Sequence, residues 1–154
     1  MRIGLLRHGI AEVDADSDFD RQLTEDGHTD LERVLDVLAG WNWRPGAILH
    51  SPLIRTTQTA DHVSGRHPGV PVYPTDALAL GFFDAILQAA ARHQDPLLIG
   101  HEPTMGNLTG RLLGAPTGAV RFERGCFALI DVDRLPPTRP ARLLLFLPSQ
   151  GLSL

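Results

Sequence analysis

Residues 3–9 read IGLLRHG, and the interpretation of the whole chain begins with them. Four mostly apolar residues, enough for one short buried strand, run directly into Arg7, His8 and Gly9. The strand therefore delivers a fixed cation and an imidazole to the edge of a sheet, where the glycine lets the backbone turn sharply. A site for an anion can begin in this way.

A second stretch of the same design follows the apolar run 47–50, which leads into Ser51 and Pro52. Ser51 as an N-cap and Pro52 in the first turn predict a helix that starts at this point. Arg55 then lies close to the beginning of that helix. The chain thus places a second guanidinium group just beyond the end of a strand.

The third stretch follows the apolar run 97–100 and reads His101-Glu102-Pro103. Pro103 again indicates the start of a helix directly after a strand. In an open parallel sheet such exits all lie at the carboxyl edge of the strands, where ligands bind. The sequence therefore predicts that four side chains converge at this edge: Arg7, His8, Arg55 and His101.

The three motifs together resemble the signature of the histidine phosphatase superfamily, which has the phosphoglycerate-mutase-like fold. They are Arg7-His8-Gly9, the segment SPLIRTTQTA at 51–60, and Gly100-His101-Glu102-Pro103. Within the superfamily, the short chain and the segment DRQLTEDG at 20–27 most resemble the SixA-type phosphohistidine phosphatases. The resemblance extends over residues 1–113 and is fainter beyond them. It implies an enzyme without cofactor or metal that removes a phosphoryl group from phosphohistidine on a partner protein and releases phosphate.

Length and composition agree with a single domain over residues 1–154. The net charge of −4 provides no basic field for nucleic acid, so an anionic substrate must be bound by a local cluster of cations. The single cysteine, Cys126, lies among apolar residues and is expected to be a buried structural thiol. Without a signal-peptide pattern or a membrane-spanning run, we expect a cytoplasmic protein with no membrane association, and a monomer.

The order of elements predicts an α/β protein: a three-layer α/β/α sandwich with a mostly parallel central sheet and minimal lid insertions. A helix capped by Thr24 and ended by Gly40 is expected, followed later by helices over 82–93 and 104–113. The apolar runs 126–132 and 142–147 are interpreted as a hairpin or as two neighbouring edge strands.

The segment between the first strand and the first helix is acidic, with aspartates at 14, 16, 18 and 20. The spacing is superficially like that of a calcium loop, but Phe19 stands where the sharp turn needs glycine, so we interpret it as a solvated loop. Arg21 matches a position where SixA-type proteins also carry arginine. A substrate contact and an ion pair with the neighbouring aspartates are both open for this residue.

The chemistry of the converging side chains suits a phosphoryl group. Arg7 and Arg55 are expected to clamp its oxygens, and the two helix N-termini add backbone donors if they face the same point. A neutral histidine can attack phosphorus and form a phosphohistidine intermediate. The resemblance makes His8 this nucleophile and His101 a second contact to the phosphoryl oxygens; the sequence alone does not decide between them.

Superfamily members that cleave esters carry a glutamate that protonates the alkoxide, but the corresponding region, 75–81, offers only Asp76. A missing acid disfavours ester cleavage, whereas a phosphohistidine imidazole takes a proton readily from water. Two alternatives stay open: a small-molecule phosphomonoesterase or mutase with Asp76 as its acid, and a non-catalytic phosphate-binding regulator. Surface or capping roles suffice for the remaining histidines, at 28, 50, 62, 67 and 93.

Overall fold

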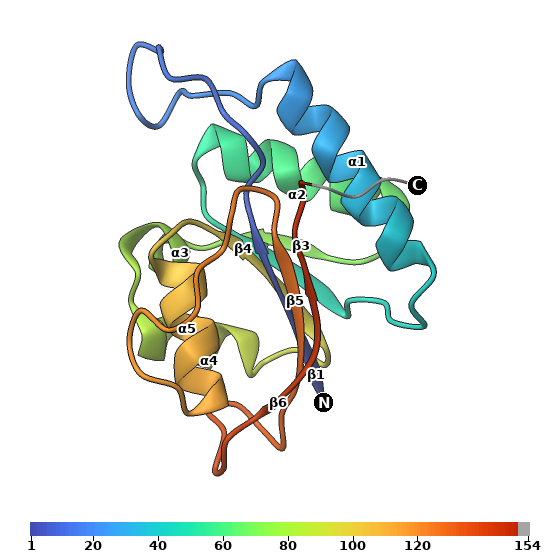
Figure 1. The fold of residues 1–154 in the computed structure, drawn as a ribbon, viewed down its shortest axis with the longest axis vertical. Coiled ribbons are helices and arrows are strands. Elements are labelled where there is room, and N and C mark those ends of the chain that lie inside the picture. Colours follow the sequence, from blue (N-terminus) through green and yellow to red (C-terminus); the bar gives the residue numbers. More distant parts are fainter. Residues whose placement is uncertain (151–154) are drawn as a thin grey trace.

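The computed structural model describes residues 1–150 and contains one six-stranded sheet in the order β3-β2-β4-β1-β5-β6 (Figure 1). The strands are β1 (Arg2–Arg7), β2 (Ala47–His50), β3 (Val72–Pro74), β4 (Pro96–Gly100), β5 (Phe127–Asp131) and β6 (Arg142–Leu147). Strands β1 to β4 are parallel, and β5 and β6 form an antiparallel pair beside β1. The expected mostly parallel sheet is confirmed, and so is the hairpin interpretation of its last two strands.

Five helices connect and cover these strands. They are α1 (Glu25–Ala39), α2 (Ile54–Arg66), α3 (Asp76–Leu80), α4 (Phe83–Ala90) and α5 (Thr104–Leu113). Helices α1 and α2 pack on one face of the sheet and α3, α4 and α5 on the other, as the two separate clusters of buried apolar side chains show. The expected three-layer α/β/α arrangement is therefore confirmed. No helix in the described part of the chain is long and apolar enough to cross a membrane.

The two faces of β1 illustrate how the sheet joins the two cores. Ile3 and Leu5 belong to the cluster under α3 to α5, whereas Leu6 belongs to the cluster under α1 and α2. Successive side chains of a strand point to opposite faces of the sheet. An apolar run whose odd and even residues are all buried is therefore typical of a strand covered on both faces. This explains why the N-terminal run reads as continuously apolar.

Helix α1 begins as predicted. The Gly27 N–H donates to Thr24 Oγ1 at 3.0 Å, so Thr24 is the N-cap. Leu31, Val34 and Leu35 form its buried face. Gly40 closes the helix by donating from its own N–H to the last-turn carbonyls.

The predicted start of α2 is wrong. Its N-cap is Leu53 rather than Ser51, and no side chain caps it. Ser51 Oγ instead lies 2.8 Å from Nε2 of His101, so this hydroxyl is used by the neighbouring strand exit. The Ser51 hydroxyl also accepts from the Leu53 N–H at 3.4 Å, so it contacts both the turn before α2 and His101. The short helix α3 was also not predicted.

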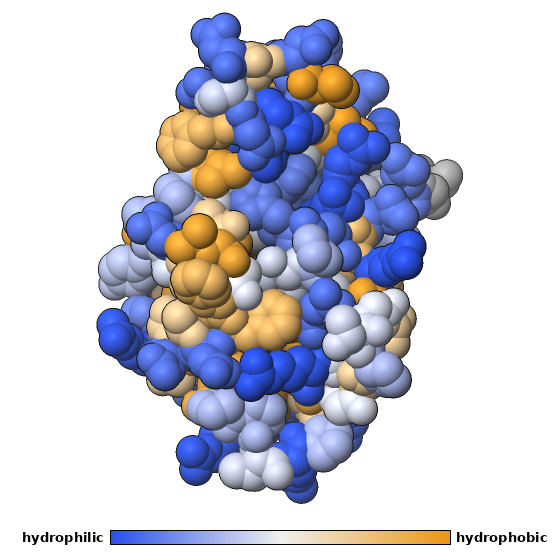
Figure 2. Space-filling model, turned by 90° about the vertical axis from the view of Figure 1, so that its left-hand side faces the viewer, coloured by the Kyte–Doolittle hydropathy of each residue, from blue (hydrophilic) through white to orange (hydrophobic). Residues whose placement is uncertain are grey.

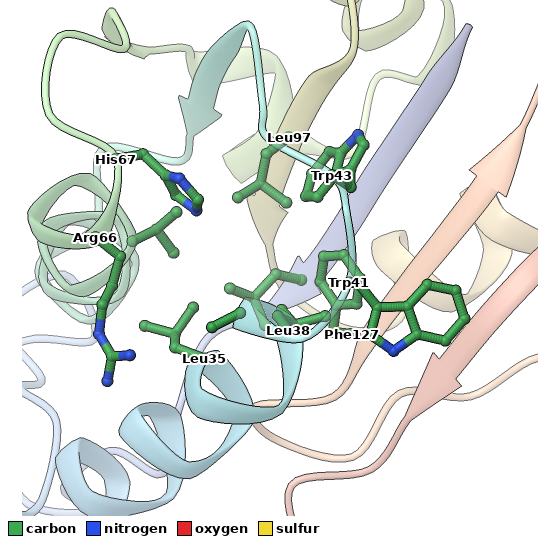
Figure 3. Close-up of a pocket in the computed structure, with 11 residues that line it drawn as sticks. Leu35, Leu38, Trp41, Trp43, Arg66, His67, Leu97 and Phe127 are labelled. Atoms are coloured by element: carbon green, nitrogen blue, oxygen red, sulfur yellow. The ribbon is translucent and has the colours of Figure 1, made fainter.

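The two tryptophans lie at the opposite end of the sheet from the strand exits. Trp43 packs against Phe127 with ring centroids 5.7 Å apart, and a Cβ on Gly4 would meet its ring at 2.6 Å. Figure 3 shows the cavity beside them, about 260 Å³, between the C-terminal ends of α1 and α2 and the sheet. Trp43 thus packs into the core, while Trp41 is 41% exposed and lines this cavity.

The contact of α1 with the segment before it gives a stability test. A Cβ on Gly27 would lie 2.1 Å from the Ile10 carbonyl oxygen, so Gly27→Ala must push the helix away from the chain that leaves β1. We expect a loss of about 1–3 kcal/mol in the free energy of unfolding, measured by urea denaturation.

Gly65→Ala is the matched control. Gly65 lies in α2 with nothing within 4 Å of the added methyl group, so this variant should gain about 0.5–1 kcal/mol. Equal stability of the two variants would contradict the close packing at Gly27.

Candidate active site

The carboxyl edge of the parallel strands brings the two predicted histidines together. In the register of β1 with β4, Arg7 lies opposite Gly100, and the His8 N–H donates to the Gly100 carbonyl at 3.0 Å. His8 and His101 are therefore the next residues out of two adjacent strands. Their ring centroids are 5.2 Å apart, and His8 is only 5% exposed.

His8 is held in one tautomer. Its Nδ1 lies 2.6 Å from the Gly9 carbonyl oxygen, which can only accept, so Nδ1 carries the proton and Nε2 keeps its lone pair. Burial lowers the pKa of His8 to about 3, with smaller contributions from His101, Arg55 and Arg7, while the bond to Gly9 opposes the shift. The ring is therefore neutral at pH 7, and Nε2 is the atom suited to attack an electrophile.

His101 is also neutral at pH 7 and is oriented by Ser51. Its Nε2 lies 2.8 Å from Ser51 Oγ, and burial, followed by the charge of Arg55, lowers the pKa of His101 to about 4. When the Ser51 hydroxyl donates to Nε2, the proton of the His101 ring is on Nδ1. This places an N–H donor on the buried side of the ring.

Each arginine is held in place by one or two hydrogen bonds to another part of the chain. Arg7 donates from one terminal nitrogen to the Phe122 carbonyl at 2.8 Å. Arg55 donates to the Asp18 carbonyl at 2.7 Å and to the Asp18 carboxylate at 3.2 Å. The Nε atoms of both arginines are buried without a hydrogen-bond partner. Their guanidinium groups are thus oriented in advance of any ligand.

Unpartnered buried donors are concentrated at this site. Among residues 1–150, four buried side-chain nitrogens have no partner: Nε of Arg7, Nε of Arg55, Nδ1 of His101 and Nε1 of Trp43. Three of the four belong to the predicted site residues. Leaving a buried donor unpaired costs about 1–3 kcal/mol, so such a concentration indicates a place for a ligand that supplies acceptors. The charge of the arginines makes an oxyanion the fitting ligand.

The N-termini of α2 and α5 provide fewer free backbone N–H donors than the sequence suggested. At the start of α5, Met105 N–H donates to the His101 carbonyl and Gly106 N–H to the Glu102 carboxylate at 2.6 Å. At the start of α2, Ile54 N–H donates to the Phe19 carbonyl at 3.2 Å. These three amides already have protein acceptors, so they are not free to bind a ligand.

Arg21 does not contact the four central residues directly. Its guanidinium pairs with Asp18 at 3.2 Å and donates to the Glu12 carbonyl at 2.5 Å. The sequence left a substrate contact and an ion pair open for Arg21, and the structure shows an ion pair with a neighbouring aspartate. Asp18 in turn pairs with Arg55, so Arg21 lies one residue away from the site.

Asp18 is the site residue that sequence reasoning missed. The hydrogen bond from Arg21, together with Arg55, holds the pKa of its carboxyl below the usual range, although slight desolvation opposes this. Nothing in the alternating aspartates distinguishes Asp18 from its neighbours. Its spacing to Arg21, three residues, was the available signal. Ser51 was noticed but given a capping role instead of its contact with His101.

Other candidate residues lie apart from this cluster. Asp76 is exposed in the first turn of α3 and makes no ion pair within residues 1–150. Cys126 is buried, as expected, and burial raises the pKa of its thiol to about 12. His28 and His62 are hydrogen-bonded at 2.7 Å and link α1 to α2, a role that differs from the expected surface or capping roles. In the described residues no three His, Cys, Asp or Glu side chains are placed to hold a metal ion.

The protonation of His8 can be measured directly. In the free protein, ¹⁵N NMR should find Nδ1 protonated and Nε2 unprotonated from pH 8 down to about pH 5, because the lowered pKa of about 3 keeps the ring neutral there. The signal should move only at more acid pH. A His8 ring that titrates near pH 6.5, or carries its proton on Nε2, would contradict this arrangement.

Comparisons with known proteins agree with this geometry. A family model described as histidine phosphatase superfamily (branch 1) matches residues 3–80. An uncharacterised protein of Picosynechococcus is 35% identical over 126 residues, which are 77% of this chain and 76% of that protein. Phosphohistidine phosphatase SixA of Escherichia coli K12 is 29% identical over 140 residues, 86% of each chain.

Among solved structures, that of the protein histidine phosphatase SixA complexed with tungstate is similar with a TM-score of 0.85. It is 25% identical in sequence, and the match covers 99% of this chain and 100% of that one. Since the family model matches residues 3–80, which is half of the chain, this chain belongs to the histidine phosphatase superfamily, and in sequence and fold it is similar to SixA.

Proposed function

We propose that this protein is a phosphatase that removes the phosphoryl group from phosphohistidine on a partner protein, through a phosphorylated His8. The observation that carries the proposal is the set of three unpartnered buried donors, on Arg7, Arg55 and His101, around a histidine whose Nε2 is free and neutral. The similarity to SixA supports phosphohistidine as the substrate class.

In the first step the oxygens of the substrate's phosphoryl group bind at this cluster of donors. Arg7, Arg55 and His101 donate to them and stabilise the charge that spreads over these oxygens in the transition state. His8 Nε2 attacks phosphorus, a bond from Nε2 to phosphorus forms, and the bond from phosphorus to the substrate imidazole breaks. The leaving imidazole keeps the electron pair and, with its other nitrogen protonated, departs as a neutral molecule.

In the second step water attacks the phosphorus of phosphorylated His8. The bond from phosphorus to Nε2 breaks, the electron pair returns to the ring, and inorganic phosphate leaves. The Gly9 carbonyl accepts from Nδ1 throughout, so the imidazole is held in the orientation and tautomer that both steps need.

Neither Asp18 nor Asp76 is suited to protonate the leaving group of an ester, and this favours phosphohistidine as the substrate. An alkoxide leaving group needs a proton donor, and a carboxyl donor works at neutral pH only when its pKa is raised. The pKa of Asp18 is shifted the other way, and Asp76 is exposed on α3 without a hydrogen bond to Arg7, His8, Arg55 or His101. A phosphohistidine imidazole requires no such donor.

The intermediate gives the main test. A radiolabelled phosphohistidine peptide should leave label on the enzyme that is lost in acid and survives base, as expected of a phosphorus–nitrogen bond. His8→Ala should remove the label and reduce turnover by at least about 10³-fold, because the nucleophile is gone. His93→Ala is the control, since His93 stacks on Tyr73 away from the site, and it should keep both.

Each other result counts against the proposal in a defined way. Label that survives acid would exclude a phosphohistidine intermediate. Efficient turnover of phosphate monoesters, lost on Asp76→Asn, would favour an ester phosphatase or mutase. Tungstate binding without turnover of any phosphorylated substrate would indicate a phosphate-binding regulator.

A second test concerns the carboxylate beside Arg55. Asp18→Asn removes a negative charge that competes with an oxyanion for this guanidinium, so tungstate should bind about three- to tenfold more tightly by calorimetry. Asp20→Asn is the matched control, because Asp20 accepts from Ser17 and pairs with no arginine, and it should change affinity much less. Weaker tungstate binding to Asp18→Asn would show that the carboxylate mainly positions Arg55.

A further inference from the structure

We propose that the mouth of the site is bordered by an apolar rim that docks a polypeptide whose phosphohistidine is flanked by basic and apolar side chains. The rim consists of Val13, Phe19, Leu80 and Phe82. This inference rests on the proposed function and adds to it the surface that recognises the substrate protein.

One half of the rim belongs to the loop 12–22. Its base is closed by a hydrogen bond from Glu12 N–H to the Gln22 carbonyl at 2.8 Å, and its tip is fixed to the site through Asp18 and Arg55. The residue after Asp18 is Phe19, whose carbonyl accepts from Ile54 N–H at the start of α2. The side chains of Phe19 and Val13 are 50% and 86% exposed.

The other half belongs to the turn between α3 and α4. Gly81 has a φ of +72°, and a Cβ on it would lie 3.0 Å from Thr104 Oγ1, so this turn packs against the first residue of α5. Thr104 follows His101 by three residues. Leu80 and Phe82, on either side of Gly81, are 62% and 59% exposed.

Single exposed apolar residues are common, but their distribution here is not even. Of the nine large apolar side chains exposed within residues 1–150, four lie on these two segments beside the site. Figure 2 views this side of the molecule and shows apolar residues both near the top and at mid-height, with more polar residues between them. A partner that inserts a phosphoryl group between the segments would cover both apolar groups.

The charge of the loop 12–22 defines what kind of partner fits. It contains five carboxylates and one guanidinium, so its formal charge equals the net charge of the whole chain, −4. Within residues 1–150, the side chains of Glu12, Asp14 and Asp16 have no hydrogen-bond or ion-pair partner, and all three are exposed. These carboxylates repel a free phosphorylated metabolite and attract lysine or arginine around a protein-borne phosphohistidine.

Two peptides of equal length test the proposal. Each carries one phosphohistidine made with phosphoramidate; one has lysine and leucine around it, and the other has glutamate and serine at the same places. At low salt the first should have at least about tenfold higher kcat/KM, and 0.5 M NaCl should reduce this ratio because ionic screening weakens the attraction. Free phosphohistidine, which cannot reach the rim, is the reference substrate.

Variants of the rim should act on the first peptide alone. The double variant Phe19→Ser, Phe82→Ser should lower its kcat/KM about fivefold or more, through KM, and leave free phosphohistidine unchanged. Asp14→Asn with Asp16→Asn should reduce the preference for lysine. Leu143→Ser is the control, because Leu143 is 43% exposed on β6 at the edge of the sheet, and it should change neither substrate.

Binding separates failure of the rim from failure of the proposed function. Fluorescently labelled peptides bound to the non-hydrolysing His8→Ala protein should show the same preference and the same loss in the rim variants. Equal binding of both peptides, or no effect of Phe19→Ser and Phe82→Ser, would overturn the docking surface even if phosphohistidine is hydrolysed. A dimer that these substitutions dissociate in sedimentation would assign the rim to a second copy of this chain.

Discussion

The site depends on the parallel pairing of β1 with β4. Because Arg7 lies opposite Gly100, the residues that follow the two strands, His8 and His101, emerge side by side. On the other side of β4, β2 ends beside it, which brings Ser51 within 2.8 Å of His101. A slip of one residue in this register would send the side chains to the opposite face of the sheet, so the apolar cores that fix the register also fix the chemistry.

Burial is what makes the two imidazoles chemically suitable. In water a histidine beside two arginines would be mostly neutral, but its ring would be mobile and solvated. In this site desolvation lowers the pKa of His8 to about 3 and that of His101 to about 4, and hydrogen bonds fix the orientation of both rings. The neutral rings allow two guanidinium groups to share a small space without a further positive charge. The unpartnered donors of Arg7, Arg55 and His101 lower the stability of the free protein in exchange for a site arranged in advance.

The sequence was informative where a side chain follows directly from its strand. The positions of Arg7, His8 and His101 could be predicted because an apolar run followed by polar residues specifies the end of a buried strand, and the sheet places such ends together. It was uninformative where a contact joins distant segments. Asp18 contacts Arg55, 37 residues away in the sequence, and Ser51 contacts His101, 50 residues away. Local sequence patterns, which indicated a solvated loop and an N-cap, could not predict these contacts.

The loop 12–22 links recognition of phosphate to recognition of its carrier. Asp18 and Phe19 are consecutive, and the carbonyl of each accepts a hydrogen bond from the start of α2. The Asp18 carbonyl accepts from the Arg55 side chain, and the Phe19 carbonyl accepts from the N–H of Ile54, the residue before Arg55. A partner docked on Phe19 therefore lies beside Asp18, the residue whose carboxylate competes with the phosphoryl group for Arg55.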